Sequence, residues 1–287
     1  MEGKKNRLKF VMTGALVFSF LLAGCSGESD QKDKGNEAVE ILKKAEKKFD
    51  TYQSYEETSI DSGKIVTEEK GKLVTMNLDE SSTAMIGEIV LKDGTRYKSY
   101  TGVDMNGFKF NNTQKNTKTA TEVIFRKYDE KGREVDGSYF KQDEEIKTFN
   151  TIKEHFDFLI TGENADYFTL SSKKDGDYTL VTATCKDLAG YQKKQNEGYK
   201  ESNSDYDPLT IQGIIVSKNE MKKYEQTLKI DSNGNAVELT THDIIDYGDE
   251  LEKDCISTIK FSKFNEVTLN TEDIDQRLKS AADVAED

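Results

Sequence analysis

TLKIDSNGNAVELTTHDIID, residues 227–246, contains two runs of alternating apolar and polar side chains around a turn sequence at 231–235. Alternation with a period of two predicts strands buried on one face, and a turn rich in Asp, Asn and Gly predicts a hairpin. A calcium loop starting at Asp231 would instead need glycine at its sixth position and glutamate at its twelfth. Those positions hold Ala236 and His242, so the stretch predicts an antiparallel hairpin.

The same alternation continues on both sides of this hairpin. Short runs with a period of two occur between residues 55 and 140, and again at 178–185, 211–217 and 256–264. Turn sequences such as 92–95 and 129–132 separate them, which predicts a meander of antiparallel strands. Pro208 is the only proline, so few strands lose a backbone donor to this residue type.

Two segments have the period of a helix instead. Residues 37–52 and 148–160 carry apolar side chains at spacings of three and four, with Phe49, Tyr52, Phe156 and Leu159 among them. The order helix, strands, helix, strands predicts an α+β protein with one large antiparallel sheet and its helices on one face. Two smaller sheets divided near residue 145 are the alternative.

Two polar stretches depart from this pattern. Residues 187–207 have little to bury, and we expect an excursion from the sheet with at most a short helix. Residues 271–287 carry a few apolar side chains among acids and predict a polar C-terminal tail that frays. The folded domain is therefore expected at 37–270.

The first 24 residues have the pattern of an export signal. Four basic side chains precede a mostly apolar run at 10–22, which is too short to span a bilayer. The following Leu22-Ala23-Gly24-Cys25 resembles the lipobox of bacterial lipoproteins. That resemblance implies cleavage before Cys25 and attachment of a diacylglyceryl group to its thiol, whose paired chains give stable anchoring. An ordinary cleavable signal with a coincidental cysteine is the alternative.

This resemblance also implies a location. Residues 25–36 contain no aromatic or large apolar side chain and predict a flexible stalk, so the body would be held at the outer face of the cell membrane. Without residues 1–24 the chain has 37 basic and 53 acidic side chains, a net charge of -16. Such a body is repelled by nucleic acid and anionic head groups, so no nucleic-acid partner is expected and the lipid is the anchor.

The order of elements resembles a family of envelope proteins. The segments ILKKAEKKFDTYQSYEET (41–58), HFDFLITGENADYFTLSSKKDGDYTLVTAT (155–184) and TIKFSKFNEV (258–267), together with the hairpin, are similar to lipoproteins of the LolA/LppX fold over residues 37–269. The resemblance implies a sheet curved into an incomplete barrel, with helices closing an apolar cavity that holds lipid chains in carrier members. Phe49, Tyr52, Phe156 and Leu159 are then the candidate cavity lining. Core packing is the alternative role for each.

Known catalytic and metal-binding motifs are absent from the sequence. It contains no nucleophile elbow, zincin motif, Cys-x-x-Cys pair or phosphate loop, and its two histidines, His155 and His242, are far apart in the chain. We therefore expect no enzyme, cofactor or metal. Cys185 and Cys255 form an even pair in an exported body, so they are a candidate disulfide. Two buried free thiols are the alternative.

Three functions remain for such a chain. The first is an anchored lipoprotein that binds a lipid or other apolar ligand in a cavity between sheet and helices. The second is an envelope interaction or assembly lipoprotein that binds another protein and no small molecule. The third is an enzyme acting on envelope polymers. The sequence argues against this function because it lacks known catalytic motifs.

Overall fold

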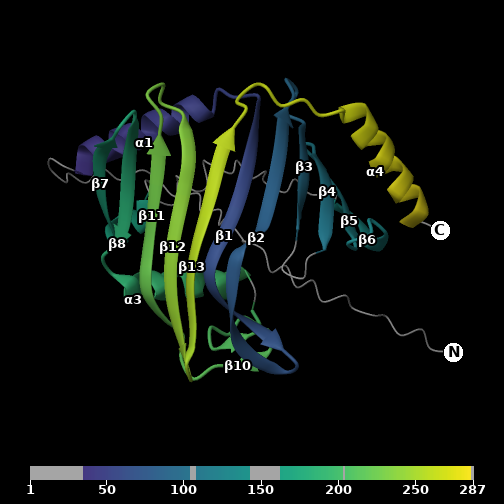
Figure 1. The fold of residues 1–287 in the computed structure, drawn as a ribbon. Helices are drawn as coiled ribbons and strands as arrows, with labels where there is room; N and C mark the ends of the chain where they lie inside the picture. Colours follow the sequence, from purple (N-terminus) through teal and green to yellow (C-terminus); the bar gives the residue numbers. More distant parts are fainter. Residues whose placement is uncertain (1–34, 104–107, 143–161, 203, 286–287) are drawn as a thin grey trace.

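A computed structural model describes residues 35–103, 108–142, 162–202 and 204–285. Eleven strands form one antiparallel sheet in the order β6-β5-β4-β3-β2-β1-β13-β12-β11-β8-β7 (Figure 1). Within the described residues the two edge strands, β6 and β7, do not pair with each other, so the sheet is an incomplete barrel. The expected large antiparallel sheet is confirmed, and division into two sheets near residue 145 is wrong.

The strands follow the chain as a meander, with the last three inserted between β1 and β8. The sheet consists of β1 (Ser54–Glu69), β2 (Lys72–Val90), β3 (Arg96–Val103), β4 (Lys109–Asn116), β5 (Thr121–Tyr128), β6 (Glu134–Gln142), β7 (Phe168–Asp175), β8 (Tyr178–Cys185), β11 (Glu220–Ile230), β12 (Ala236–Gly248) and β13 (Leu251–Ser262). A short 3-10 helix, η1 (Gly162–Tyr167), precedes β7, and a small hairpin, β9 (Thr210–Ile211) with β10 (Ile214–Ile215), lies outside the sheet.

The hairpin predicted at 231–235 joins β11 to β12. The Asp231 carboxylate accepts the backbone N–H groups of Asn233 at 2.9 Å and Asn235 at 2.8 Å. Gly234 has a φ of 81°, which glycine adopts without steric penalty. The turn itself therefore uses the carboxylate that a calcium loop would have needed.

A glycine bulge interrupts the longest strand pair. The register of β1 with β2 shifts between Asp61 and Gly63. Gly63 has a φ of +104°, and a Cβ there would lie 2.1 Å from the carbonyl oxygen of Asp254. Only glycine fits this close approach, and a bulge of this kind bends the strand and increases its twist.

The first predicted helix is confirmed as α1 (Gly35–Phe49). It buries Ala38, Leu42, Ala45 and Phe49 against the sheet. These positions recur every three to four residues, so one stripe of the helix faces the core while its lysines remain on the other side. The helix crosses the sheet near one end of the strands (Figure 1).

The polar stretch 187–207 contains a helix that the sequence underrated. α3 (Leu188–Ser202) packs against β11, and Tyr191 is fully buried among aromatic neighbours. The prediction of an excursion with little to bury was wrong because one large ring supplies the buried surface that several aliphatic side chains usually provide. α3 lies near the opposite end of the strands from α1 (Figure 1).

The expected polar tail is also wrong. Residues Thr271–Ala285 form α4, which buries Ile274 and Leu278 against Tyr97 and Ile124. Ile124 lies between Val123 and Phe125 on β5, so its side chain points to the opposite face from theirs. α1 and α3 thus share one face of the sheet, as expected, whereas α4 packs on the other.

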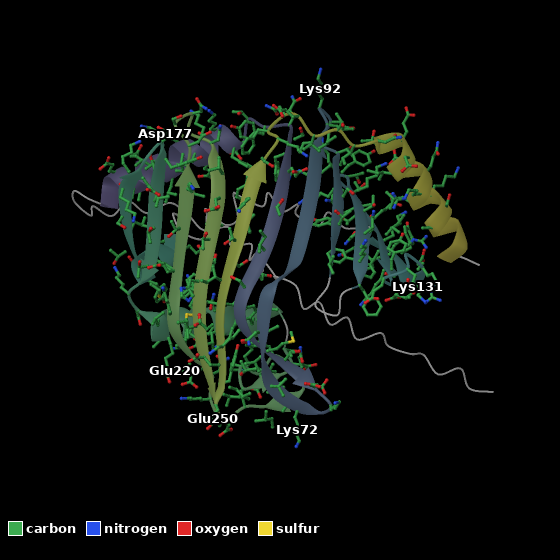
Figure 2. All side chains as sticks on the ribbon, in the orientation of Figure 1. Lys72, Lys92, Lys131, Asp177, Glu220 and Glu250 are labelled. Atoms are coloured by element: carbon green, nitrogen blue, oxygen red, sulfur yellow. The ribbon has the colours of Figure 1, made fainter. Side chains whose placement is uncertain are left out.

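Several predictions fall outside the described residues. These are the signal peptide, Cys25, the stalk and the helix at 148–160 with its candidate residues Phe156 and Leu159. In the described part, charged side chains such as Lys92, Asp177, Lys72 and Glu250 point away from the body at the ends of strands (Figure 2). Part of the highly charged composition therefore lies at the exposed ends of strands, whereas Glu57 and Lys98 are buried.

Candidate functional site

Strand register defines an inner face of the sheet. Ser59, Ile259, Leu239, Leu228 and Val181 are opposite one another across five strands, so they form one row on the same face. The last four pack with Leu42 and Phe49 of α1. We call the face that meets α1 the inner face.

The part of the inner face beneath α1 is a filled core. The Phe49 ring lies 4.8 Å from that of Tyr55 and 5.8 Å from that of Phe261, both edge-on. Tyr52 stacks on Phe264 with 4.5 Å between ring centres and donates its hydroxyl to Asn235 Oδ1. Two of the predicted lining residues, Phe49 and Tyr52, are thus brought together as packing between helix and sheet, which was their alternative role.

The part beneath α3 is rich in tyrosine. The Tyr191 ring lies 5.0 Å from that of Phe168 and 5.3 Å from that of Tyr224. Beside them, Lys253 Nζ is 2.6 Å from Asp243 Oδ2. Burial opposes the charged form of Lys253, but the Asp243 carboxylate outweighs it, so the pKa of the ammonium is raised above its ordinary value. This pair is therefore charged and mutually compensated.

A polar row separates these two covered parts. Asp61, Ser257, Thr241 and Gln226 face one another across four strands, two residues along from the apolar row beneath α1. Gln226 is only 4% exposed, and its amide nitrogen donates to Thr241 Oγ1 at 3.1 Å. Gln226 Oε1 and Asp61 Oδ1 are buried and accept no hydrogen bond from any described residue.

The inner face of β3–β6 is lined by aromatic side chains. We call this surface the inner wall; it consists of Tyr100, Phe110, Val123, Phe125 and Phe140, together with Phe108 just before β4, whose ring centre lies 4.5 Å from Lys127 Nζ. Phe110 stacks with Phe125 at 6.4 Å between ring centres, and the Phe140 side chain is 52% exposed. The described helices pack elsewhere: α1 on β7, β8 and β12, α3 on β11, and α4 on the opposite face of β5 and β6.

Asn112 lies within the inner wall. It pairs in register with Tyr100 on one side and Phe125 on the other. Its Oδ1 is buried and has no hydrogen-bond partner among the described residues. The inner wall therefore combines apolar rings with an isolated acceptor, a composition typical of sites that bind small molecules.

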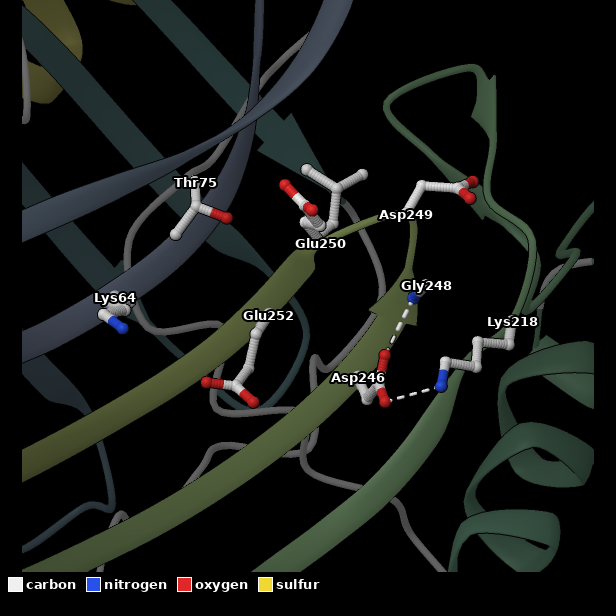
Figure 3. Close-up of a pocket in the computed structure, with 9 residues that line it drawn as sticks. Lys64, Thr75, Lys218, Asp246, Gly248, Asp249, Glu250 and Glu252 are labelled. Carbon is white, nitrogen blue, oxygen red and sulfur yellow. Dashed lines mark hydrogen bonds and ion pairs between the residues drawn. The ribbon is translucent and has the colours of Figure 1, made fainter.

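The pocket in Figure 3 has different chemistry. It has a volume of about 600 Å³ and is lined by Lys64, Thr75, Lys218, Asp246, Gly248, Asp249, Glu250, Leu251 and Glu252. Asp246 pairs with Glu252 in register, and both lie on the outer face because Leu251 and Lys253 point inward. A second pocket, of about 650 Å³, lies beside α3 and includes Tyr206 and Pro208. Neither contains Phe49 or Tyr52.

Cys185 and Cys255, the two cysteines within the described ranges, are free and buried. Cys185 ends β8 and Cys255 lies on β13, with β11 and β12 between them in the sheet. Three strand spacings amount to about 14 Å, whereas a disulfide needs Cα atoms within about 7 Å. The structure therefore contradicts the disulfide and contains two thiols, and burial raises the pKa of Cys255 to about 11.

The remaining chemical groups are dispersed. His242 Nε2 is 2.9 Å from Asp254 Oδ1 on the outer face, while His155 lies outside the described residues. Within the described ranges, no three metal-ligating side chains converge. The same ranges contain no helix with the length and apolar character needed to cross a bilayer.

The sequence predictions missed the inner wall, although a pattern for it exists. Tyr100, Phe108, Phe110, Phe125 and Phe140 occupy alternate positions of predicted strands, on the face opposite Ile124 and Tyr139. Both faces of these strands carry apolar side chains. Apolar side chains on both faces predict that each face is covered by a different part of the protein or by a ligand, and α4 covers one of them.

Comparisons with known proteins concern the fold. No family model and no curated protein matches the sequence. Among solved structures, the lipoprotein LppX of Mycobacterium tuberculosis is 12% identical, with a TM-score of 0.38. The match covers 82% of this chain and 98% of the LppX chain. LprF of Mycobacterium bovis is 12% identical with a TM-score of 0.37, covering 83% of this chain and 97% of its own. In fold, the chain resembles LppX and LprF.

Proposed function

We propose that the protein is a membrane-anchored extracytoplasmic lipoprotein that binds a lipid or another apolar ligand on the inner face of its sheet. The observation that carries the proposal is the inner wall. It groups five aromatic side chains and Val123 on one face, with Asn112 and Lys127 between them, while α1, α3 and α4 pack on other parts of the sheet. Apolar surface of this kind is stabilised by burial against a hydrocarbon chain, at about 25 cal/mol per Å² removed from water.

The rest of the molecule is consistent with a protein that binds a ligand and does not transform it. The described ion pairs, such as Lys253–Asp243 and Lys218–Asp246, are compensated and lie on different faces. The anchor is proposed from the lipobox alone, Leu22-Ala23-Gly24-Cys25. Binding at the inner wall and anchoring at Cys25 place an apolar ligand at the outer surface of the cell membrane.

The chain contains no tryptophan, which permits a direct test of binding. A Phe125→Trp variant has a single reporter in the inner wall, and an Ile215→Trp variant has one on the exposed β10 strand as a control. Titration with dodecanol should shift the Phe125→Trp emission to the blue and leave Ile215→Trp unchanged. Equal responses, or no response from Phe125→Trp, would exclude the inner wall as the binding surface.

The anchor has its own test. Cys25→Ala removes the thiol that would be lipidated, so labelled palmitate fed to the cells should be incorporated into the wild type and not into this variant. Incorporation into Cys25→Ala would contradict the lipid anchor at Cys25. Mass spectrometry of an organic extract from wild-type protein should then reveal the natural amphiphile.

A second candidate function is binding to an envelope protein. The observation that favours it is the apolar base of the β9–β10 hairpin, away from its turn, where Ile215 is 78% exposed and Leu209 is also exposed. Crosslinking in cells of wild type and Ile215→Ser would test it, because a partner at this base should be lost from the variant. An unchanged set of partners would count against the hairpin.

A further inference from the structure

The polar row predicts which head group the bound molecule carries. This inference rests on the proposed function, because it concerns the polar end of a ligand on the inner face. The row occupies β1, β13, β12 and β11, on the same face as the inner wall of β3–β6. Only β2 lies between the row and the inner wall, a separation of about 10 Å from β1 to β3, so an amphiphile whose chain lies on the inner wall is long enough to bring its head to the row.

The row offers acceptors that are not satisfied. Gln226 Oε1 and Asp61 Oδ1 are both buried, and within the described ranges neither accepts a hydrogen bond. One N–H of the Gln226 amide donates to Thr241 Oγ1, whereas the amide oxygen has no partner among the described residues. Buried polar atoms in native proteins are generally paired, and an orphaned acceptor therefore indicates a donor supplied from elsewhere.

The charges around the row point in the same direction. Lys253, two residues from Cys255 on the inner face of β13, is held at 2.6 Å by Asp243. Asp61 makes no ion pair with the residues that the structure describes, so its carboxylate is the uncompensated charge of the row. A phosphate or carboxylate head would meet that carboxylate in a buried environment, where like charges repel strongly.

We propose that the polar row binds a head group that donates hydrogen bonds and carries no negative charge, such as an amine or a hydroxyl. Asp61 Oδ1 and Gln226 Oε1 accept from this group. Anionic amphiphiles of the same chain length are excluded by Asp61. The polar row thus selects the ligand by its head group. The inner wall binds the hydrocarbon chain of the ligand, whichever head group it carries.

Three amphiphiles with the same chain test this selection on the full-length protein. Dodecylamine, dodecanol and dodecyl phosphate are compared by displacement of the fluorescent probe N-phenyl-1-naphthylamine. We expect the amine and the alcohol to bind at least about tenfold more tightly than the phosphate, a difference of about 1.4 kcal/mol. Phosphate binding that equals or exceeds the other two would overturn the proposal.

Asp61→Asn gives the sharper comparison, because it keeps an acceptor, removes the charge and adds a donor. This variant should bind dodecyl phosphate more tightly and reduce the difference between head groups to less than about threefold. The matched control, Asp254→Asn, makes the same charge change on the outer face of β13 and should leave the difference intact. Equal effects of the two variants would mean that Asp61 does not contact the head group.

The same assay distinguishes ligand binding on the inner wall from head-group selection by the polar row. If all three amphiphiles bind equally, ligand binding stands and selection by the polar row is wrong. If none displaces the probe, the proposed function itself is wrong, and the selection is wrong with it. Thermal unfolding of each variant shows whether a loss of binding reflects a loss of fold.

Discussion

The two halves of the inner face are built from the same alternating strands but differ in what covers them. Beneath α1, the rings of Phe49, Tyr55 and Phe261 pack edge-on and are buried. On β3–β6, the aromatic side chains of the inner wall are only partly buried, and Phe140 is more than half exposed. Alternation therefore creates apolar faces, but the position of the helices decides which face becomes core and which remains accessible.

The largest expected effect is on the covered half. Phe49→Ala removes a ring that contacts four other aromatic side chains. We expect the free energy of unfolding to fall by about 3–5 kcal/mol, as for other buried Phe→Ala changes. Urea denaturation followed by circular dichroism measures it. A loss below about 1 kcal/mol would mean that this half is not a filled core.

The next effect concerns the outer face. Leu278→Ala removes a side chain of α4 that is 2% exposed and packs with Tyr97 and Ile124. We expect a loss of about 2–3 kcal/mol, at the low end for Leu→Ala because the cluster is small. Hydrogen exchange should show the loss concentrated in α4, β3 and β5. Uniform faster exchange across the sheet would instead show that α4 is part of the main cooperative unit.

A smaller change in stability is expected on the open half. Phe125→Ala removes a ring that is partly exposed in the inner wall, so the free energy of unfolding should change by less than about 1 kcal/mol. Binding of dodecanol should weaken by about tenfold, since the chain loses its contact with the ring. Phe49→Ala is the reciprocal control. Under conditions in which this variant is still folded, its binding of dodecanol should be unchanged. Should Phe125→Ala destabilise as much as Phe49→Ala, the two halves would not differ.

The smallest effect is on the outer-face pocket, which touches neither half. The Lys218 ammonium at 2.6 Å, and then the Gly248 N–H, hold the pKa of Asp246 below its ordinary value of 3.8. A lowered pKa in the folded state contributes stability above pH 3.8, and this contribution is lost as the pH falls through the lower folded value. Lys218→Met should therefore raise the Asp246 midpoint toward 3.8 in a titration of carboxyl NMR shifts.

Asp207 is the control for this titration. Its pKa is lowered by the Leu209 backbone N–H and the Thr210 hydroxyl, without Lys218. Its midpoint should stay in place in Lys218→Met. Movement of both midpoints would indicate a general change of charge and not the loss of one ion pair. Ligand binding should be unchanged in this variant, because the pocket lies on the outer face.

Much of the fold could be predicted because its patterns are local. The hairpin at 231–235 depends on a short turn sequence, and α1 on a stripe of small and aromatic residues. α3 and α4 were missed because their stability comes from partners distant in the chain: Tyr191 packs on β7 and β11, and Leu278 on β3 and β5. A helix with few apolar residues is not stable by itself, and tertiary packing supplies what its sequence lacks.

The sequence by itself determined the alternation of the strands, the turns between them, the first helix and the acidic net charge, since each depends on neighbouring residues or on composition. The tertiary structure decided which apolar faces of the strands the described helices cover. Phe49 and Tyr52 became core because α1 lies over β7, β8 and β12, whereas Phe110 and Phe125 remained accessible because the described helices pack elsewhere. Apolar residues in alternating strands have equal reason to be buried, and only the placement of the covering helices distinguishes them.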